Sequence, residues 1–265
     1  MKVVKVLLVL MLCLGLTACG KSDAEKSFDQ AVESYQKREA TLDKEIKSLK
    51  KIIKKKGKPL DEQTMTNAMK AVKDATNKKY KIPDVAKEDE EIKKQTNEIN
   101  NVKFDETIKS LKEAGNELSD SRKQLVLVTN PKEKDVLTRL NKVKNIDAVE
   151  AVTEDNDPNG HLNKAGGYTT TVYFYSHLVS SDKLTEPKNK VIENGTDGGG
   201  AIEVYANVED ANKRNTYLSS FDGSAFSSGS HEVFGTCVVR TSDNLTASQQ
   251  KSLTKDIVTE LTRLY

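Results

Sequence analysis

Aspartate and asparagine alternate in one glycine-containing segment, at a spacing that suits calcium. Five positions of a calcium-binding loop pattern (one, three, five, six and nine) are filled by Asp155, Asp157, Asn159, Gly160 and Asn163. In such loops, oxygen ligands converge around a turn that the glycine permits. The pattern therefore offers a calcium site whose side-chain ligands would be Asp155, Asp157, Asn159 and Asn163.

The second half of this segment departs from the calcium pattern. Gly166 stands at position twelve, where a bidentate glutamate is expected. A calcium site would then need a carboxylate from Glu154, or from Asp197 or Asp222 in two other loops. The alternative is an Asx-type turn, in which Asp and Asn side chains accept hydrogen bonds from nearby backbone amides. The carboxylates could also act as acid and base in an envelope hydrolase, although loop carboxylates are expected to stay ionised.

Three polar loops, at about 153–168, 194–200 and 221–231, form the expected contact surface for a partner, because binding residues concentrate on loops. The candidate contact residues are Glu154, His161, Lys164, Tyr168, Asp197 and Asp222. If the three loops meet on one concave face, a binding site is indicated; if they scatter, turn chemistry explains their composition.

Nucleophilic catalysis finds little support in the sequence. Ser230 precedes His231, but adjacency in sequence is not triad geometry, and no G-x-S-x-G motif is present. Cys237 lies in an apolar strand-like segment, where a cysteine is usually a packing residue. The glycine-rich loop 194–200 precedes a strand and lacks the P-loop lysine pattern. We expect a protein that is not an enzyme and has no cofactor other than the calcium considered above.

The tetrapeptide Leu-Thr-Ala-Cys that ends at Cys19 closes an apolar run starting at Val6, after a short basic segment. The run is too short to span a bilayer. It resembles a lipoprotein signal peptide with its lipobox, which implies that residues 1–18 are removed and that Cys19 becomes a palmitoylated diacylglyceryl-cysteine. An ordinary secretory peptide cut near Ala18 is the alternative. Lipidation of Cys19 would anchor the chain on the extracytoplasmic face of the cell membrane.

Composition argues against nucleic acid as a partner. Loss of Lys2 and Lys5 with the leader brings the 42 basic residues of the chain level with its 40 acidic ones. Nucleic-acid binding would need a clustered basic surplus. The lysine-rich, tryptophan-free composition is typical of a Gram-positive lipoprotein, although composition does not exclude an outer-membrane one.

Residues 19–129 predict a helical stalk. The first helix starts at a Ser22 capping box and carries an apolar residue every seven positions, at Phe28, Tyr35, Leu42 and Leu49. A second helix is predicted from Asp61 and a third from about Asp84. Such stripes pack most simply against one another as an antiparallel bundle or hairpin with coiled-coil spacing, although a stripe could instead recruit a partner helix. The lysine-rich stretch 47–58 is either solvated surface or a contact with lipid headgroups.

Residues 130–265 predict a small α+β domain with about four strands and two to three helices. The expected strands are Ala148–Thr153, Thr169–Tyr175, Ala201–Tyr205 and Gly235–Thr241. The expected helices are a short one after Pro131, one over Val208–Ser219 that Asn207 caps, and a final one that opens with a capping box at Thr246. The expected order is αβββαβα, with Asn130 capping the first helix.

Two sets of segments resemble known surface proteins. The stretch from Pro59 to Leu125 resembles the three-helix repeats of giant Ebh-type matrix-binding proteins, which implies a surface spacer. Segments 152–160, 162–169, 220–223 and 239–242 resemble an uncharacterised family of firmicute lipoproteins with an Ebh-like (extracellular matrix-binding protein-like) label. The second resemblance implies cell-surface placement and supplies no activity to carry over.

These observations predict a lipid-anchored cell-surface protein whose helical spacer presents an α+β binding domain. Its partner would be an envelope polymer or another surface protein. One rival is a phage superinfection-exclusion lipoprotein that blocks DNA entry by engaging a membrane partner. The others are a calcium-dependent envelope-binding module and the envelope hydrolase built on Glu154, Asp155 and Asp157.

Overall fold

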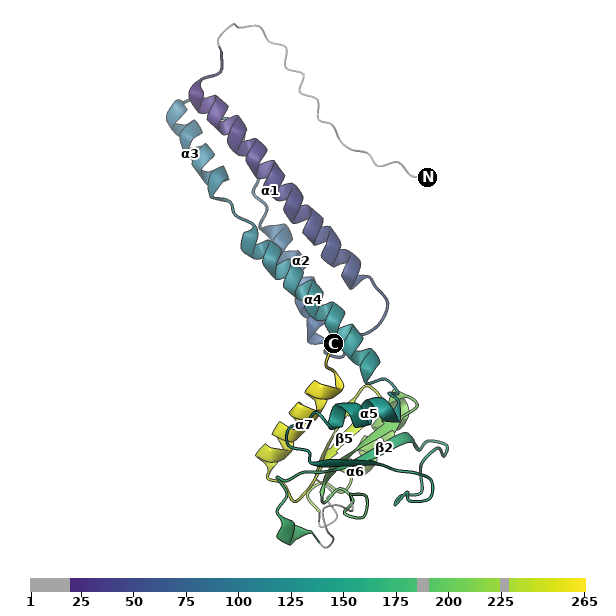
Figure 1. Ribbon diagram of the computed structural model, residues 1–265. Coiled ribbons are helices and arrows are strands. Elements are labelled where there is room, and N and C mark those ends of the chain that lie inside the picture. Colours follow the sequence, from purple (N-terminus) through teal and green to yellow (C-terminus); the bar gives the residue numbers. More distant parts are fainter. Residues whose placement is uncertain (1–19, 185–190, 225–228) are drawn as a thin grey trace, which may run out of the picture.

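The computed structural model describes residues 20–184, 191–224 and 229–265. The predicted leader and Cys19 lie outside this range, so their assignment stays a prediction. Within the range, the chain has the predicted α+β class, with a helical bundle followed by a sheet domain (Figure 1). No helix of the described part is both long and apolar enough to cross a bilayer.

The bundle contains four helices where three were predicted. They are α1 (Asp23–Ile53), α2 (Gln63–Asn77), α3 (Asp89–Asn101) and α4 (Asp105–Leu127). Helix α1 runs the length of the bundle, α3 packs along its first half, and α2 and α4 pack along its second half (Figure 1). The predicted seam of α1 is buried, and the Ser22 capping box is confirmed.

The predicted third helix is wrong at its start and in its middle. It begins at Asp89, because Gln95 holds the preceding segment extended by bonding the backbone of Asp84 and Ala86. It breaks after Asn101, where the phenyl ring of Phe104 is 2% exposed and packs on Tyr35. After the break, α4 packs against both α1 and α2, whereas α3 packs along α1.

Helix α2 is shorter than α1, and an extended segment continues along the bundle from its end to the start of α3. The hydroxyl of Tyr35 fixes this segment: it donates to the carbonyl of Tyr80 and accepts from the amide of Tyr80, both at 3.0 Å. At the far end, the hydroxyl of Ser22 donates to Asp89, which places the starts of α1 and α3 side by side.

The second part of the chain is a five-stranded antiparallel sheet with helices on both faces. Its strands are β1 (Ala148–Ala151), β2 (Tyr168–Tyr175), β3 (Gly199–Tyr205), β4 (Ser230–Phe234) and β5 (Cys237–Thr241). The sheet order is β1-β2-β3-β5-β4, so β1 and β4 form its edges. The remaining elements are α5 (Glu133–Leu140), a 3-10 turn (Ser181–Lys183), α6 (Val208–Ser219) and α7 (Ala247–Leu261).

Strand β4 was not predicted, and Gly235 was wrongly placed inside the last strand. Gly235 and Thr236 form instead the two-residue turn of the β4–β5 hairpin, with Gly235 at φ +61°. A glycine with positive φ at the first turn position suits such a hairpin. The Ser-His-Glu-Val-Phe sequence of β4 lacks a clear apolar alternation because this edge strand is only partly buried.

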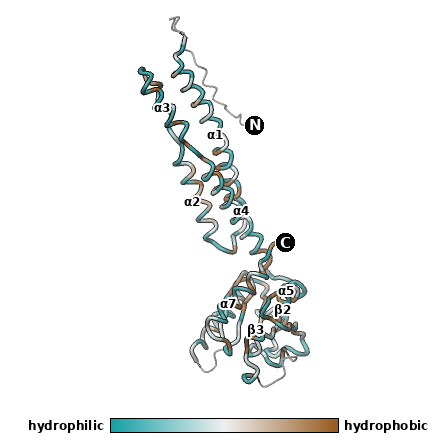
Figure 2. The backbone as a smooth tube through the Cα atoms, turned by 60° about the vertical axis from the view of Figure 1, so that its left-hand side comes forward, coloured by the Kyte–Doolittle hydropathy of each residue, from teal (hydrophilic) through white to brown (hydrophobic). Residues whose placement is uncertain are grey.

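The faces of the sheet have different cores. Helices α5 and α7 cover one face, where apolar side chains from β2, β3 and β5 gather with those of the two helices. Helix α6 and the loop 153–167 cover the other, which buries Tyr168, Tyr205 and Val238. In Figure 2 the hydrophobic colour recurs at intervals along the bundle and gathers on β2 and β3.

The bundle and the sheet domain share packing at their junction. Val128 follows α4 and is fully buried in the domain core, and its carbonyl accepts from the amide of Thr236 at 2.8 Å. Leu60 and Leu125 of the bundle pack against the same core. Asn130 does not cap α5, which begins after Lys132 without a side-chain cap; it adopts φ +46°, and its side-chain oxygen accepts from Thr169.

Candidate functional site

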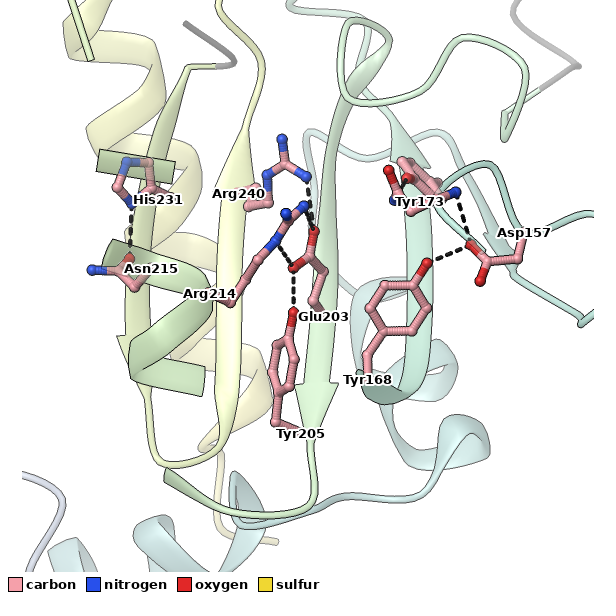
Figure 3. Close-up of polar contacts among 10 residues, drawn as sticks. Asp157, Tyr168, Tyr173, Glu203, Tyr205, Arg214, Asn215, His231 and Arg240 are labelled. Carbon is pink, nitrogen blue, oxygen red and sulfur yellow. Dashed lines mark hydrogen bonds and ion pairs between the residues drawn. The ribbon is translucent and has the colours of Figure 1, made fainter. Parts of the chain in front are cut away.

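A buried ion cluster lies between the sheet and α6. Glu203 on β3 is 0% exposed, and its carboxylate accepts from Arg214 on α6 at 2.7 and 2.9 Å. Arg240 on β5 donates at 2.8 Å and the hydroxyl of Tyr205 donates at 2.9 Å (Figure 3). Two guanidinium groups from different elements therefore contact one carboxylate.

The cluster keeps Glu203 ionised. Burial raises the pKa of the Glu203 carboxyl, but the hydrogen bonds from Arg214 and the charge of Arg240 outweigh it, so the pKa lies below its ordinary value. Burial and the neighbouring negative charge of Glu203 raise the pKa of Tyr205. A carboxylate held this way stabilises charge and does not exchange protons near neutral pH.

The predicted calcium segment folds as a loop centred on Asp157. Its carboxylate accepts from the backbone amides of Asn159 at 3.0 Å and Leu162 at 2.8 Å, and from the hydroxyl of Tyr168 (Figure 3). Burial opposes ionisation of Asp157, but these donors outweigh it and lower the pKa. The loop thus has the hydrogen-bonding pattern of the Asx-turn alternative.

The other proposed calcium ligands serve the same loop. The side-chain amide of Asn159 donates to the hydroxyl of Tyr173 at 3.2 Å, and that of Asn163 donates to Glu154 at 3.0 Å. Across the part of the chain that the structure describes, no three His, Cys, Asp or Glu side chains gather where they could hold a metal ion. The geometry favours the turn interpretation over the calcium interpretation. Asp155, the remaining proposed ligand, is not part of a group of this kind.

Two of the predicted contact residues border a shallow cavity of about 350 Å³ above the ion cluster. It lies between the loop and α6, and its lining includes His161, Tyr168, Tyr205, Lys213, Arg214 and Tyr217. Tyr168 is only 1% exposed, so its main contribution is to hold the loop through Asp157. Glu154 and Lys164 border a neighbouring hollow of about 240 Å³.

The described residues of the three polar loops do not all meet at one end of the sheet. Tyr168 pairs with Tyr205 at one end of the β2–β3 ladder, whereas the backbone carbonyl of Asp197 accepts from Ser242 near the other end. Asp222 follows α6 and faces the imidazole of His231 on β4, at 3.2 Å. The predicted contact residues therefore divide between opposite ends of the sheet.

The nucleophile candidates have structural partners. Cys237 is 0% exposed, and burial raises the pKa of its thiol to about 12. The hydroxyl of Ser230 is within hydrogen-bonding distance of Thr241, while the ring of His231 contacts Asn215 and Asp222. Side chains of successive strand residues point to opposite faces, so Ser230 and His231 diverge.

Sequence reasoning missed the ion cluster, although a signal was present. Glu203 stands in Ala-Ile-Glu-Val-Tyr and Arg240 in Val-Val-Arg-Thr, each a charged residue inside a strand with apolar neighbours. A charge buried in a central strand requires an opposite charge, so these two residues could have been paired. Arg214 gives no such signal, because arginine is ordinary on a helix surface.

A second concave region, of about 550 Å³, lies between the edge strand β4 and helix α7. Its lining includes Glu232 and Phe234 from β4 and Lys251, Thr254, Lys255 and Val258 from α7. It could not be predicted without β4. Comparisons of the chain with protein-family models, curated protein sequences and solved structures found no match.

Proposed function

We propose that the protein is a lipid-anchored cell-surface binding protein without enzymatic activity. Cys19 would carry the acyl chains, the bundle would act as a spacer, and the sheet domain would meet the partner. The extracytoplasmic face of a Gram-positive cell membrane is the location that the leader and the composition favour.

The observation that carries this proposal is the direction of α1. The helix starts four residues after Cys19 in the sequence and runs toward the sheet domain, so the start of α1 and the domain lie at opposite ends of the bundle (Figure 1). At 1.5 Å per residue, its 31 residues span about 46 Å. A domain held at this distance is accessible to partners beyond the lipid headgroups.

The absence of enzymatic activity in this proposal rests on how the reactive groups are used. The carboxylates of Glu203 and Asp157 are held ionised by structural donors. The thiol of Cys237 is buried with a raised pKa. None of these groups combines exposure with the pKa near neutrality that acid–base or nucleophilic catalysis requires.

Metabolic labelling tests the anchor. The full chain is expressed in a Gram-positive host supplied with a clickable palmitate analogue, alongside Cys19→Ala and, as a matched control, Cys13→Ser within the leader. We expect label and membrane association in the wild type and in Cys13→Ser, and loss of the label in Cys19→Ala. Label that persists without Cys19, or an unlabelled wild type, would contradict the proposal.

A further inference from the structure

The groove between β4 and α7 combines an open sheet edge with a partly apolar wall. Strand β4 pairs only with β5 among the described strands, so its outer edge offers backbone groups to solvent. Phe234 and Val258 supply apolar surface from the two walls. Its volume of about 550 Å³ lies within the ordinary range of binding pockets.

The hairpin register decides which backbone groups are free. The two-residue turn closes on the pair Phe234–Cys237, which in such hairpins exchanges its hydrogen bonds. Pairs alternate along the ladder, so the amides and carbonyls of Val233 and His231 point away from β5. The side chains of Ser230, Glu232 and Phe234, in contrast, face the groove.

The charges that line the groove indicate which kind of segment it would bind. Lys251 and Lys255 are exposed on the α7 wall, and neither forms an ion pair within the described residues. Glu232 on β4 is the one carboxylate of the lining, which therefore has a net positive charge. Residues four apart on a helix are about 6 Å apart along its axis, close to the spacing of about 6.7 Å between alternate residues of a strand.

We infer that this groove binds an extended segment of a partner protein, with acidic residues at alternate positions, as a sixth strand beside β4. The backbone of the segment pairs with His231 and Val233, and the acidic side chains reach Lys251 and Lys255. This inference rests on the proposed function, since it names the partner class that the displayed domain would bind.

Charge also argues against a second copy of the chain in the groove. Antiparallel pairing of two β4 edges places both α7 helices on the same face of the joined sheet. The two pairs of lysines, Lys251 and Lys255 with their symmetry mates, then meet across the junction, where the two copies of Glu232 balance only two of the four positive charges. Like charges in such proximity disfavour the assembly.

The experiment uses the mature full chain in detergent micelles and a capped nine-residue probe of alternating valine and threonine. In the probe, glutamates replace two valines that are separated by one threonine. In a matched peptide, lysines replace the same two valines. Fluorescence anisotropy should show the lysine peptide binding at least about fivefold more weakly, as expected for two exposed ion pairs. Amide hydrogen exchange should show protection of His231 and Val233 by the glutamate peptide.

Two variants and a matched control localise the binding. Lys251→Glu with Lys255→Glu should reverse the preference between the peptides, whereas Lys134→Glu with Lys144→Glu, exposed outside the groove, should leave it unchanged. Val233→Pro should abolish binding because it removes an outward-facing donor while sparing the bonds to β5, a position where an edge strand tolerates proline.

Equal binding of the two peptides, or unprotected amides at His231 and Val233, would overturn the inference. If the protein instead forms concentration-dependent dimers that Val233→Pro abolishes, the groove binds a second copy of the chain, and the inference is overturned as well. The palmitate experiment is independent of the groove, so a chain that binds the glutamate peptide without being acylated would refute only the anchor.

Discussion

The carboxylate of Glu203 accepts hydrogen bonds from two guanidinium groups inside the domain. Arg214 arrives from α6 and Arg240 from β5, so this one side chain ties a helix to two strands. Removing one member of a buried ion cluster is costly, because the remaining charges stay desolvated without a partner. The cluster is therefore a sensitive point for stability of the domain.

We expect Glu203→Gln to lower the free energy of unfolding by about 3 kcal/mol at neutral pH, because it removes the carboxylate that accepts hydrogen bonds from Arg214 and Arg240 in the domain interior. Urea denaturation measures the change. The matched control is Glu232→Gln, at the exposed position of β4, for which a change within about 0.5 kcal/mol is expected.

The difference between wild type and Glu203→Gln should shrink in acid. The folded pKa of Glu203 lies below its ordinary value of 4.5, so its stabilisation is complete above that pH and is lost as the pH falls through the folded pKa. A difference that stays constant from pH 7 down to the folded pKa and below it would show that ionisation of Glu203 does not support the fold.

Among the helices, the end of α1 depends on a residue that interrupts the apolar stripe of α4. The guanidinium of Arg122 donates to the carbonyls of Ile52 at 2.7 Å, Ile53 at 3.3 Å and Gly57 at 2.9 Å. The last carbonyls of a helix lack partners within it, so this contact caps α1 from a neighbouring helix.

Arg122→Met should therefore lower the melting temperature by several degrees, corresponding to about 1–3 kcal/mol for charged hydrogen bonds to carbonyls. Thermal denaturation followed by circular dichroism provides the measurement. The adjacent Lys123→Met removes only an exposed ion pair with Asp120 and should cost less than about 0.5 kcal/mol. Equal losses in the two variants would contradict a capping role for Arg122.

Local sequence signals predicted the starts of the helices that have a complete side-chain cap, α1, α6 and α7, and failed where tertiary contacts decide. The capping boxes at Ser22 and Thr246 are confirmed, because a cap is complete within four residues. The break before Phe104 depends on a ring packed against a distant helix, and no glycine or proline marks it. Strand β4 was not predicted because this edge strand is only partly buried, so its sequence lacks a clear alternation of apolar and polar residues.

The candidate sites were predicted less fully than the fold. Composition identified the polar loop around Asp157, because residues that favour turns can be recognised by their type. The cavity above Arg214 and the β4–α7 groove each join elements distant in the chain, so their existence depends on the sheet order. Spacing within a single segment contains no information about that order.

Across the whole molecule, the turn at Gly235 joins the domain to the bundle. A β-carbon added to Gly235 would lie 2.4 Å from the carbonyl oxygen of Val128, and the residue has φ +61°. Thr236 in the same turn donates its amide to that carbonyl. Close backbone contact at this turn thus contributes to the orientation of the domain on the bundle, beside the packing of Leu60 and Leu125 on the domain core.

Gly235→Ala should destabilise the protein by about 1–3 kcal/mol and loosen the junction, because strain from positive φ adds to the clash with Val128. The control is Gly223→Ala, which also has positive φ (+71°) but has no atom within 4 Å of the added carbon. Small-angle X-ray scattering should show a broader distance distribution for Gly235→Ala alone. Identical scattering of both variants would mean that the turn does not set the orientation.

The parallel course of α1 and α4 bears on mechanical load. Helix α1 runs from the proposed anchor toward the domain, and α4 enters the domain in the same direction (Figure 1). A pull on the domain against the anchor would draw the two helices past each other lengthwise. Their shared seam, with Gly115 fitted against Leu49 and Ile52, would then bear the force along its whole length, whereas peeling would open one turn at a time.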